Sequence, residues 1–300
     1  MTRPAPLTIG DRVGIVATAR RIKADDVEAA VRVLEEWGLR VSLSPHLYNT
    51  SHSYLAGTDE DRISALQQFI DEPDIKAIFC ARGGYGTTRI IDAIDFRTFM
   101  NHPKWIIGYS DITSLHLKLS TLGIESIHGT MPIMFGKDDV ASSLLSLRQL
   151  LFDETHILRA SHSAFNKPGK ATGQLVGGNL SLLADSLGSS HELETKGKIL
   201  IIEEVDEYMY RVDRMFVQLK RAGKLNSLAG LAIGHFSDIK DSESFGETVE
   251  EIILYHTREF SYPVGFGFPV GHIHPNEAWI CGRNASLEVT KQDAKIEMER

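Results

Sequence analysis

The sequence predicts an α/β protein of two domains. Short apolar runs alternate with amphipathic helical patterns through the first half of the chain, which is typical of a parallel sheet covered by helices. In the second half the pattern changes, and one strand-like run, at 264–268, is rich in glycine. The length of 300 residues also exceeds what one small core needs. We therefore expect an N-terminal α/β domain with a parallel sheet and a more β-rich C-terminal α/β domain.

The first half supplies the alternating pattern. Its first helix is stopped by Gly38, and its second helix begins at a capping residue, either Thr58 or Asp59. Helices of this length can serve as crossover connections between parallel strands. The predicted strands are 13–17, 41–43, 75–80, 105–107 and 124–127, and the predicted helices are 24–37, 59–70, 111–122 and 140–152.

The periodicity lapses between residues 153 and 172, where the chain is polar and contains Pro168 and Gly169. Such a segment is typical of an interdomain connection. We therefore predict a domain at 1–150, a linker at 151–170 and a second domain at 171–300. The second domain is expected to contain helices at 180–187, 208–221 and 248–256, strands at 198–202, 228–236 and 264–268, and a β-hairpin of 278–281 and 285–289.

Composition narrows the classes of function. A net charge of −8, with no basic run, argues against nucleic acid as a partner. No apolar stretch has the length of a signal-peptide core or of a membrane span. Cys80 and Cys281 both lie in strand-like segments, and we interpret them as buried free thiols rather than a disulfide. These features predict a cytoplasmic protein with no membrane partner.

Ser110 is the first candidate for chemistry. It follows the apolar run 105–107 and the break at Gly108, and it precedes a helical pattern. A serine at a strand-to-helix turn exposes its hydroxyl near free backbone N–H groups, as a nucleophile requires. The alternative is that Ser110 or Asp111 only caps the helix. The segment also lacks the second glycine of the usual G-x-S-x-G motif.

A glycine-rich turn at residues 81–88 is the second candidate, with the sequence ARGGYGTT. Adjacent glycines let the backbone approach a ligand and direct N–H groups at an anion. The turn matches neither a P-loop nor a G-x-G-x-x-G fingerprint. An oxyanion hole, a phosphate cradle and a plain tight turn all remain open for this segment.

Acids and histidines at strand ends are the third group of candidates for chemistry. Glu203 and Glu204 close one apolar strand, and His272 and His274 lie in a glycine-flanked loop after another. A histidine in such a loop is a candidate general base, and one of the glutamates could orient it. The alternatives are a solvated strand end for the acids and a zinc site that includes His235. No recognised ligand spacing supports a metal, so we expect neither a metal nor a cofactor.

The order serine, acid, histidine occurs in known hydrolases, in which the triad is defined by geometry rather than spacing. The chain resembles the L,D-carboxypeptidase family of serine peptidases, which also contains the microcin C immunity proteins. The resemblance covers nearly the whole chain, and its pieces occur in the family's order. They are ARGGYG at 81–86, IGYSDIT at 107–113, GGNLSLL at 177–183, ILIIEEVDE at 199–207, YRVDRMFVQLK at 210–220 and GFPVGHIHPN at 267–276.

The resemblance implies a cytoplasmic serine carboxypeptidase of cell-wall recycling, with its active site at the interface of the two domains. Such an enzyme releases the terminal D-alanine of murein tetrapeptides by cutting after the L-centre of lysine or diaminopimelate. The resemblance assigns the nucleophile to Ser110, the base to His272 and the orienting acid to Glu203. The oxyanion donors would be the N–H groups of Asp111 and Gly84. A murein peptide is the expected substrate, and a homodimer is the expected assembly.

Substrate recognition is less sharply defined by the sequence. The segment 277–282, EAWICG, departs from the Thr-Leu-Pro-hydrophobic-Gly run of the family, and a Glu-Glu pair replaces the usual Glu-Asp. Arg82 and Arg211 are candidates for binding the substrate carboxylate, with ordinary salt bridges as the alternative for each. The rival functions are an immunity peptidase acting on peptidyl or aminoacyl sulfamoyl-adenylates, and a non-catalytic module that binds an anion.

Overall fold

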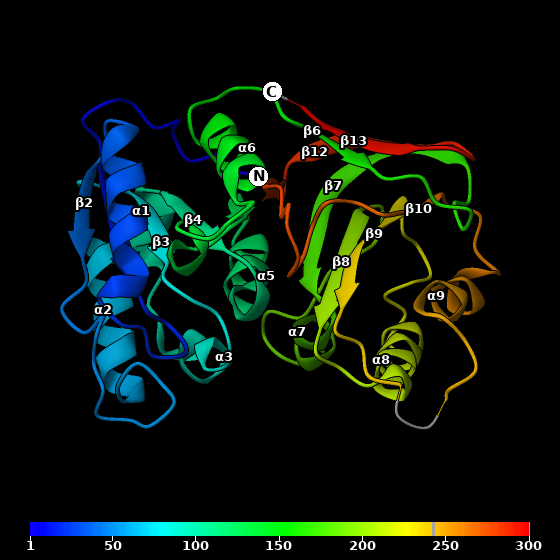
Figure 1. Cartoon of the computed structure of the whole chain (residues 1–300), viewed down its shortest axis with the longest axis horizontal. Coiled ribbons are helices and arrows are strands. Elements are labelled where there is room, and N and C mark those ends of the chain that lie inside the picture. The colour runs from blue at the N-terminus through cyan, green and yellow to red at the C-terminus, as the bar shows by residue number, and fades with distance from the viewer. Residues whose placement is uncertain (242–243, 300) are drawn as a thin grey trace. The chain divides into compact units, whose positions relative to one another are not determined.

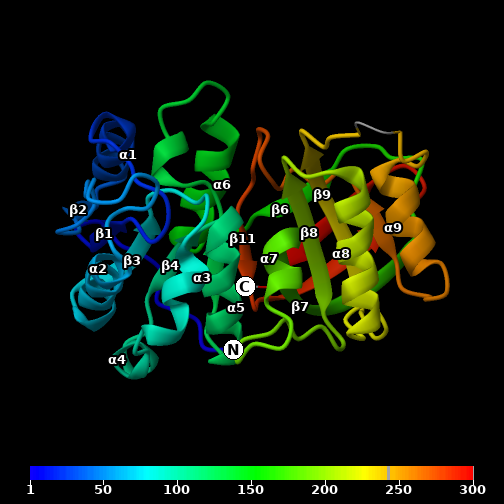
Figure 2. The same cartoon turned by 90° about the horizontal axis from the view of Figure 1, so that it is seen from below.

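The computed structural model describes residues 1–241 and 244–299, and its elements are drawn from two sides in Figures 1 and 2. The chain divides into two compact units. Unit 1 comprises Met1–Glu154 and Glu277–Ile280, and unit 2 comprises Thr155–Asn276 and the chain from Cys281 onward. Each unit is built around its own sheet. The predicted two-domain α/β fold is confirmed.

The sheet of unit 1 has the strand order β2–β1–β3–β4–β5–β11. The pairs among β1 to β5 are parallel, as the alternating pattern predicts. The strands are β1 (Arg12–Val16), β2 (Arg40–Leu43), β3 (Ile75–Cys80), β4 (Trp105–Gly108), β5 (Ser126–His128) and β11 (Trp279–Cys281). Four of the predicted strands are confirmed within one residue, and the strand predicted at 124–127 begins two residues later.

Helices connect these strands. Thr58 is the cap of α2, because its hydroxyl accepts the Asp61 N–H at 3.1 Å while the Asp61 carboxylate accepts the Thr58 N–H at 2.9 Å. The helices of unit 1 are α1 (Asp25–Glu36), α2 (Asp59–Asp71), α3 (Thr87–Ile90), α4 (Arg97–Asn101), α5 (Thr113–Thr121) and α6 (Ala141–Leu151). Short 3₁₀ turns occur at Ile91–Ala93, Ser110–Ile112 and Pro132–Met134. Among the described residues no helix is long and apolar enough to cross a bilayer.

Helix α2 packs closely on the sheet of unit 1. A Cβ atom at Gly14 of β1 would lie 2.5 Å from the ring of Phe69, so only glycine fits at that strand position. Phe69, Leu66 and Ile70 of α2 are all buried in the core. The same face of the helix also buries Arg62, one turn before Leu66. A charged group is therefore held inside unit 1.

The sheet of unit 2 has the order β10–β9–β8–β7–β12–β13–β6. Its β7, β8, β9 and β10 are parallel, and β12 and β13 continue it in the antiparallel direction to β6. The strands are β6 (Ile157–Ala160), β7 (Gly169–Asn179), β8 (Ile199–Val205), β9 (Gly230–Ser237), β10 (Val264–Phe266), β12 (Asn284–Val289) and β13 (Ala294–Met298). The helices are α7 (Leu180–Asp185), α8 (Met209–Arg221) and α9 (Val249–Thr257).

The predicted hairpin of 278–281 and 285–289 is wrong. Strand β11 joins β5 in the first sheet, whereas β12 pairs with β7 and β13 in the second. Within unit 1, Trp279 is fully buried and stacks on the His128 ring with centroids 5.1 Å apart. Burial of this large ring favours pairing with β5 over a local hairpin.

The expected linker at 151–170 also differs from the structure. The boundary between the units follows Glu154, and β6 lies inside the expected linker and pairs with β13. The return of Glu277–Ile280 to unit 1 has no counterpart in the predicted boundaries.

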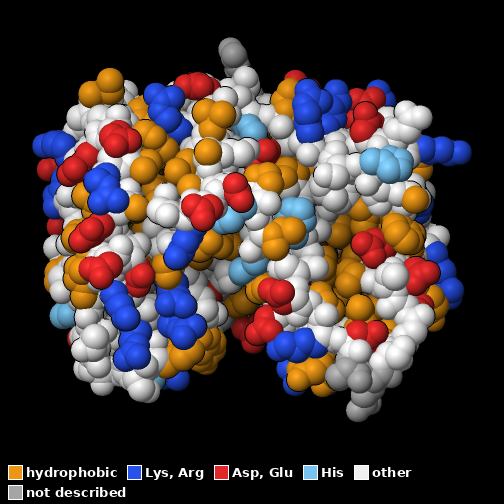
Figure 3. Space-filling model, in the orientation of Figure 1, with side chains coloured by type: hydrophobic (Ala, Val, Ile, Leu, Met, Phe, Trp, Pro, Cys, Tyr) orange, Lys and Arg blue, Asp and Glu red, His pale blue; other side chains and the backbone are white. Residues whose placement is uncertain are grey.

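The surface carries charges of both signs. On the face drawn in Figure 3, Lys and Arg side chains are interspersed with Asp and Glu over each unit.

Candidate active site

Ser110 lies at the turn between β4 and α5. Its φ of +63° is in the left-handed region, which is uncommon for a residue other than glycine. A backbone held in this way costs about 1–3 kcal/mol and is found at functional sites more often than elsewhere. Gly108 makes the turn possible, because a Cβ there would lie 2.7 Å from the Ile112 side chain. The turn leaves Ser110 half-buried at the carboxyl end of a central strand.

The glycine-rich turn lies next to Ser110 in unit 1. A Cβ at Gly83 would be 3.3 Å from the Cβ of Ser110 and 3.4 Å from its Oγ. Gly84 and Gly86 have φ values of +109° and +144°, which glycine adopts readily. The turn and the serine thus form one local constellation, as the predicted pairing of a nucleophile with nearby N–H donors requires.

A buried arginine fixes this turn. Arg62 has no exposed side-chain surface, and its Nη1 donates to the carbonyl oxygens of Thr18 and Gly86, each at 2.7 Å. Its Nη2 pairs with Asp59. A Cβ at Gly86 would lie 2.8 Å from Nη1, so the glycine is needed for this contact.

Asp111 holds the same end of the turn, one residue further along the chain. Its Oδ2 accepts the backbone N–H of Thr87 at 2.9 Å, and the Thr87 hydroxyl lies 3.0 Å from that of Thr18. Burial raises the pKa of Asp111, and the hydrogen bonds from Thr87 oppose that effect. The residue that follows Ser110 is therefore tied directly to the glycine turn.

In unit 2 the structure brings Glu203 and His272 together. Glu203 lies on β8 with no exposed side-chain surface, and its Oε2 is 2.7 Å from Nδ1 of His272. Burial alone lowers the pKa of His272, but the charge and the hydrogen bond of Glu203 outweigh it, so that the pKa is raised. A carboxylate on Nδ1 also fixes the tautomer that leaves Nε2 able to accept a proton.

Two glycines make room for the Glu203 carboxylate. A Cβ at Gly271, whose φ is +133°, would lie 3.2 Å from Oε2 of Glu203. A Cβ at Gly234 would lie 2.4 Å from the carbonyl oxygen of Val270 and 3.3 Å from the Cβ of Glu203. The loop is also held by the Gly271 N–H, which donates to Oδ1 of Asn276 at 3.0 Å.

Glu204 points elsewhere. Its Oε1 accepts from Nδ2 of Asn179 at 2.8 Å, and its Oε2 accepts from the N–H and hydroxyl of Ser181 at 2.8 and 2.6 Å. Neighbouring side chains on a strand face opposite ways, so only one of the two glutamates pairs with the histidine. The pair is made by Glu203, and Glu204 secures the start of α7.

Comparison with known proteins identifies the family. A family model described as the LD-carboxypeptidase N-terminal domain matches residues 13–129, and one described as the LD-carboxypeptidase C-terminal domain matches residues 172–287. The chain belongs to the LD-carboxypeptidase family. It is an enzyme, a serine-type carboxypeptidase.

Several relatives are similar along most of their length. The chain is 38% identical to a probable murein peptide carboxypeptidase of Bacillus subtilis, over 98% of this chain and 94% of that protein. It is 33% identical to the murein tetrapeptide carboxypeptidase of Pseudomonas aeruginosa, over 93% and 94%. The microcin C7 self-immunity protein MccF of Escherichia coli is 25% identical over 97% and 94%.

A solved structure agrees with the fold. The crystal structure of a muramoyltetrapeptide carboxypeptidase from Oxalobacter formigenes superposes with a TM-score of 0.88 at 28% identity, covering 96% of this chain and 99% of that one. The two-domain architecture is therefore that of the LD-carboxypeptidase family.

A zinc site that includes His235 is the alternative that the sequence leaves open for these histidines. No group of three or more His, Cys, Asp or Glu side chains is placed to hold a metal ion in the described part of the chain. His235 lies on β9, where its backbone N–H donates to the carbonyl oxygen of Val270 at 2.7 Å. Burial lowers the pKa of His235, against the opposing charge of Glu203.

Arg211, the second candidate for carboxylate binding, has a counterion. Its Nη1 lies 3.4 Å from Oε1 of Glu207, and its guanidinium is 5.4 Å from the ring centre of Tyr208 and 5.8 Å from that of Tyr210. The ordinary salt bridge that the sequence leaves open for Arg211 is therefore present.

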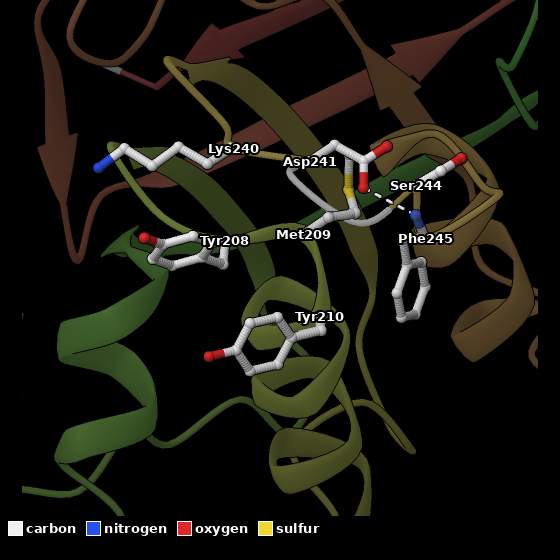
Figure 4. Close-up of a pocket in the computed structure, with 7 residues that line it drawn as sticks. All are labelled: Tyr208, Met209, Tyr210, Lys240, Asp241, Ser244 and Phe245. Carbon is white, nitrogen blue, oxygen red and sulfur yellow. Dashed lines mark hydrogen bonds between the residues drawn. The ribbon is translucent and has the colours of Figure 1, made fainter.

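Arg211 stands beside a pocket at the carboxyl ends of β8 and β9. The pocket has a volume of about 670 Å³, and Figure 4 shows two tyrosine rings, a lysine and a phenylalanine around it. Its walls are held together by backbone bonds, among them Met209 N–H to the Lys240 carbonyl at 2.9 Å. The lining residues are Tyr208, Met209, Tyr210, Lys240, Asp241, Ser244 and Phe245.

Arg62 is the residue of this site that the sequence analysis misses. The signal was present, because Arg62 lies four residues before Leu66 and eight before Ile70, on the predicted apolar face of α2. A charged residue on such a face is either tolerated at the edge or buried with partners, and the pattern alone does not separate these cases.

We predict that Arg62→Met destabilises the protein by about 3 kcal/mol, because two buried carbonyl oxygens lose charged donors. Urea unfolding measures the loss. Arg89→Met is the matched control, since Arg89 also pairs with Asp59 but is half-exposed. Its cost should be much smaller than that of Arg62→Met, because solvent screens the exposed pair. Hydrogen exchange of residues 81–88 should rise in Arg62→Met only, and equal exchange in both variants would contradict the role of Arg62.

We predict that His272 titrates above the ordinary histidine pKa of about 6.5, because Glu203 stabilises the imidazolium. NMR titration of the His272 ring measures this pKa. In Glu203→Gln the charge is lost and burial dominates, so the pKa should fall below that of the wild type. Glu204→Gln is the control and should lower it less, since Glu204 acts on His272 only at longer range. A larger fall in Glu204→Gln would reverse the assignment.

Proposed function

We propose that this chain is a serine L,D-carboxypeptidase that hydrolyses the bond between the L-centre of lysine or diaminopimelate and the terminal D-alanine of murein tetrapeptides. Ser110 is the proposed nucleophile, His272 the base and Glu203 the orienting acid. The observation that carries the proposal is the 2.7 Å hydrogen bond between buried Glu203 and His272. The left-handed turn at Ser110 and the similarity to murein peptide carboxypeptidases support it.

The proposed reaction proceeds through an acyl-enzyme. His272 Nε2 accepts the proton of the Ser110 hydroxyl as its Oγ attacks the scissile carbonyl carbon. The resulting imidazolium is stabilised by Glu203 and then gives its proton to the amino group of the leaving D-alanine. Water, deprotonated by His272, attacks the ester, and the released serine oxygen recovers the proton. One peptide bond and one water are consumed, and a carboxylic acid and an amine are formed.

The oxyanion is proposed to bind to two backbone N–H groups, those of Asp111 and Gly84. Donors of this kind contribute about 3–4 kcal/mol each in comparable sites. The proposal is supported by the contact of Gly83 with Ser110 and by the hydrogen bonds that Asp111 and Arg62 make to the glycine turn. These bonds hold the donors in place before substrate arrives.

The proposed setting is the recycling of murein peptides in the cytoplasm, by a homodimer. The terminal alanine is proposed to be recognised by its free carboxylate, so that the enzyme removes one residue from the chain end. A tetrapeptide would be cut, whereas an added fifth residue would carry the carboxylate beyond its partner and leave a charge unpaired.

A second candidate is hydrolysis of peptidyl or aminoacyl sulfamoyl-adenylates. The match to the self-immunity protein MccF along 97% of this chain supports this second candidate. The higher identities to proteins named as murein peptide carboxypeptidases favour the first proposal. A non-catalytic anion-binding module is the remaining rival for the glycine turn.

We predict that Ser110→Ala keeps its fold and loses at least about three orders of magnitude in kcat, as other triad nucleophiles do. Release of D-alanine from a purified tetrapeptide is the measurement, with circular dichroism as the control for folding. Glu203→Gln should lose much more activity than Glu204→Gln in the same assay. Near wild-type turnover in Ser110→Ala would remove this serine from the mechanism, and loss of activity on chelation, restored by zinc, would overturn the metal-free triad.

We predict that mass spectrometry of digests shows loss of a single alanine from the tetrapeptide, with the pentapeptide and an all-L tetrapeptide intact. Aminoacyl sulfamoyl-adenosine is tested in parallel at the same concentration. Faster hydrolysis of the adenylate than of the tetrapeptide would favour the second candidate. Failure of every substrate, together with no labelling of Ser110 by a serine-directed reagent, would favour a binding module.

A further inference from the structure

Two arginines of unit 1 flank the glycine turn beside Ser110. Arg82 directly precedes Gly83, the glycine that lies against the serine side chain. Arg20 lies against the next glycine, since a Cβ at Gly84 would be 3.1 Å from the Cβ of Arg20 and 3.4 Å from its Cδ. Both arginines are thus neighbours of the glycine turn that contacts Ser110, and the charge of Arg20 acts on Arg82.

Neither arginine has a counterion within the described residues. The only hydrogen bond that the Arg82 side chain makes there is a long one, from Nη1 to the carbonyl oxygen of Arg21 at 3.5 Å. The Arg20 guanidinium lies over the ring of Tyr54, 5.1 Å from its centre. No carboxylate oxygen of the described chain lies within ion-pair distance of either group, and Asp26 acts on Arg82 only from farther away.

Three other arginines of the same unit have counterions. Arg62 and Arg89 share the carboxylate of Asp59. Arg12 pairs with Glu72 at 2.7 Å. Arg82 differs most clearly from these paired arginines, because it is half-buried and the positive charge of Arg20 acts on it. Burial and the charge of Arg20 both lower the pKa of Arg82, so the free protein carries an electrostatic cost that an anion would relieve.

We propose that Arg20 and Arg82 together bind the free carboxylate at the end of the substrate peptide, a role that rests on the carboxypeptidase reaction proposed above. Arginine suits this task because its planar guanidinium donates two parallel hydrogen bonds to one carboxylate. A carboxypeptidase substrate presents that group one residue beyond the scissile carbonyl.

The spacing along the turn agrees with this assignment. Gly83 lies against Ser110 and Gly84 lies against Arg20. Adjacent residues are about 3.8 Å apart between Cα atoms, which is also the step from the scissile residue to the terminal residue of a peptide. The contact with the serine and the contact with Arg20 are therefore made by neighbouring residues of the turn.

The experiment compares two substrates that differ only in charge at the chain end: a tetrapeptide with a free carboxylate and its C-terminal amide. Arg82→Met and Arg20→Met should each lower kcat/KM for the acid by about 10- to 100-fold, the range for a lost charged hydrogen bond, with most of the effect in KM. Hydrolysis of the amide should stay within about twofold of the wild type, as expected when no bond to the amide was lost.

Arg89→Met is the matched control, because it removes a paired arginine close to the same turn. It should leave hydrolysis of both substrates unchanged. A second readout is binding of the acid and the amide to the Ser110→Ala protein, measured by calorimetry with and without each arginine substitution. The acid should bind more weakly in the arginine variants, and the amide should bind equally.

The outcomes separate the two proposals. If the wild type releases D-alanine and the arginine variants lose acid and amide hydrolysis equally, the proposed carboxylate site of Arg20 and Arg82 is overturned. The carboxypeptidase reaction then stands. If the wild type releases neither D-alanine from the acid nor D-alaninamide from the amide, and the Ser110→Ala protein binds neither substrate, the proposed function is overturned together with the proposed carboxylate site. Loss of hydrolysis and of binding for the acid alone, with the amide unaffected, supports the proposed carboxylate site of Arg20 and Arg82.

Discussion

The hydrogen bond between Glu203 and His272 is the constraint on which unit 2 is organised. A carboxylate without exposed surface is costly unless it is paired, and this one is paired at 2.7 Å. The pairing requires space, which agrees with the glycines at 234 and 271, since a Cβ at Gly271 would crowd the carboxylate at 3.2 Å. Glu204 is engaged by Asn179 and Ser181 and so cannot compete for the histidine.

In unit 1 the corresponding constraint is the backbone conformation of Ser110. The left-handed conformation of Ser110 is costly, and it persists only if the surroundings impose it. Asp111 is bonded to Thr87, and Arg62 is bonded to the carbonyl oxygen of Gly86, so the carboxyl-terminal end of the glycine turn is held from inside the unit. Burial of Arg62 is a cost that three hydrogen-bonding partners offset.

The sequence predicted most of unit 1, because local signals are strong there. Apolar runs mark the strands, and Thr58 and Asp61 form the capping box that sets the start of α2. The hairpin predicted for 278–289 was wrong because β11 pairs with β5, about 150 residues earlier in the chain. No local pattern encodes such a pairing. The pairing of Glu203 with His272 followed from strand alternation and family position together, whereas Arg62 was missed because periodicity reports which face a residue is on and not what it binds.

Arginines illustrate the limit of sequence reasoning most clearly. Arg82 and Arg211 are equivalent candidates in the sequence, since each could bind the free carboxylate of a carboxypeptidase substrate or form an ordinary salt bridge. The structure separates them by their counterions: Glu207 compensates Arg211, and no carboxylate of the described residues compensates Arg82. Proteins tolerate uncompensated, half-buried charge where a ligand supplies the missing partner. The same argument adds Arg20, which no motif marks, because only the fold brings it against Gly84.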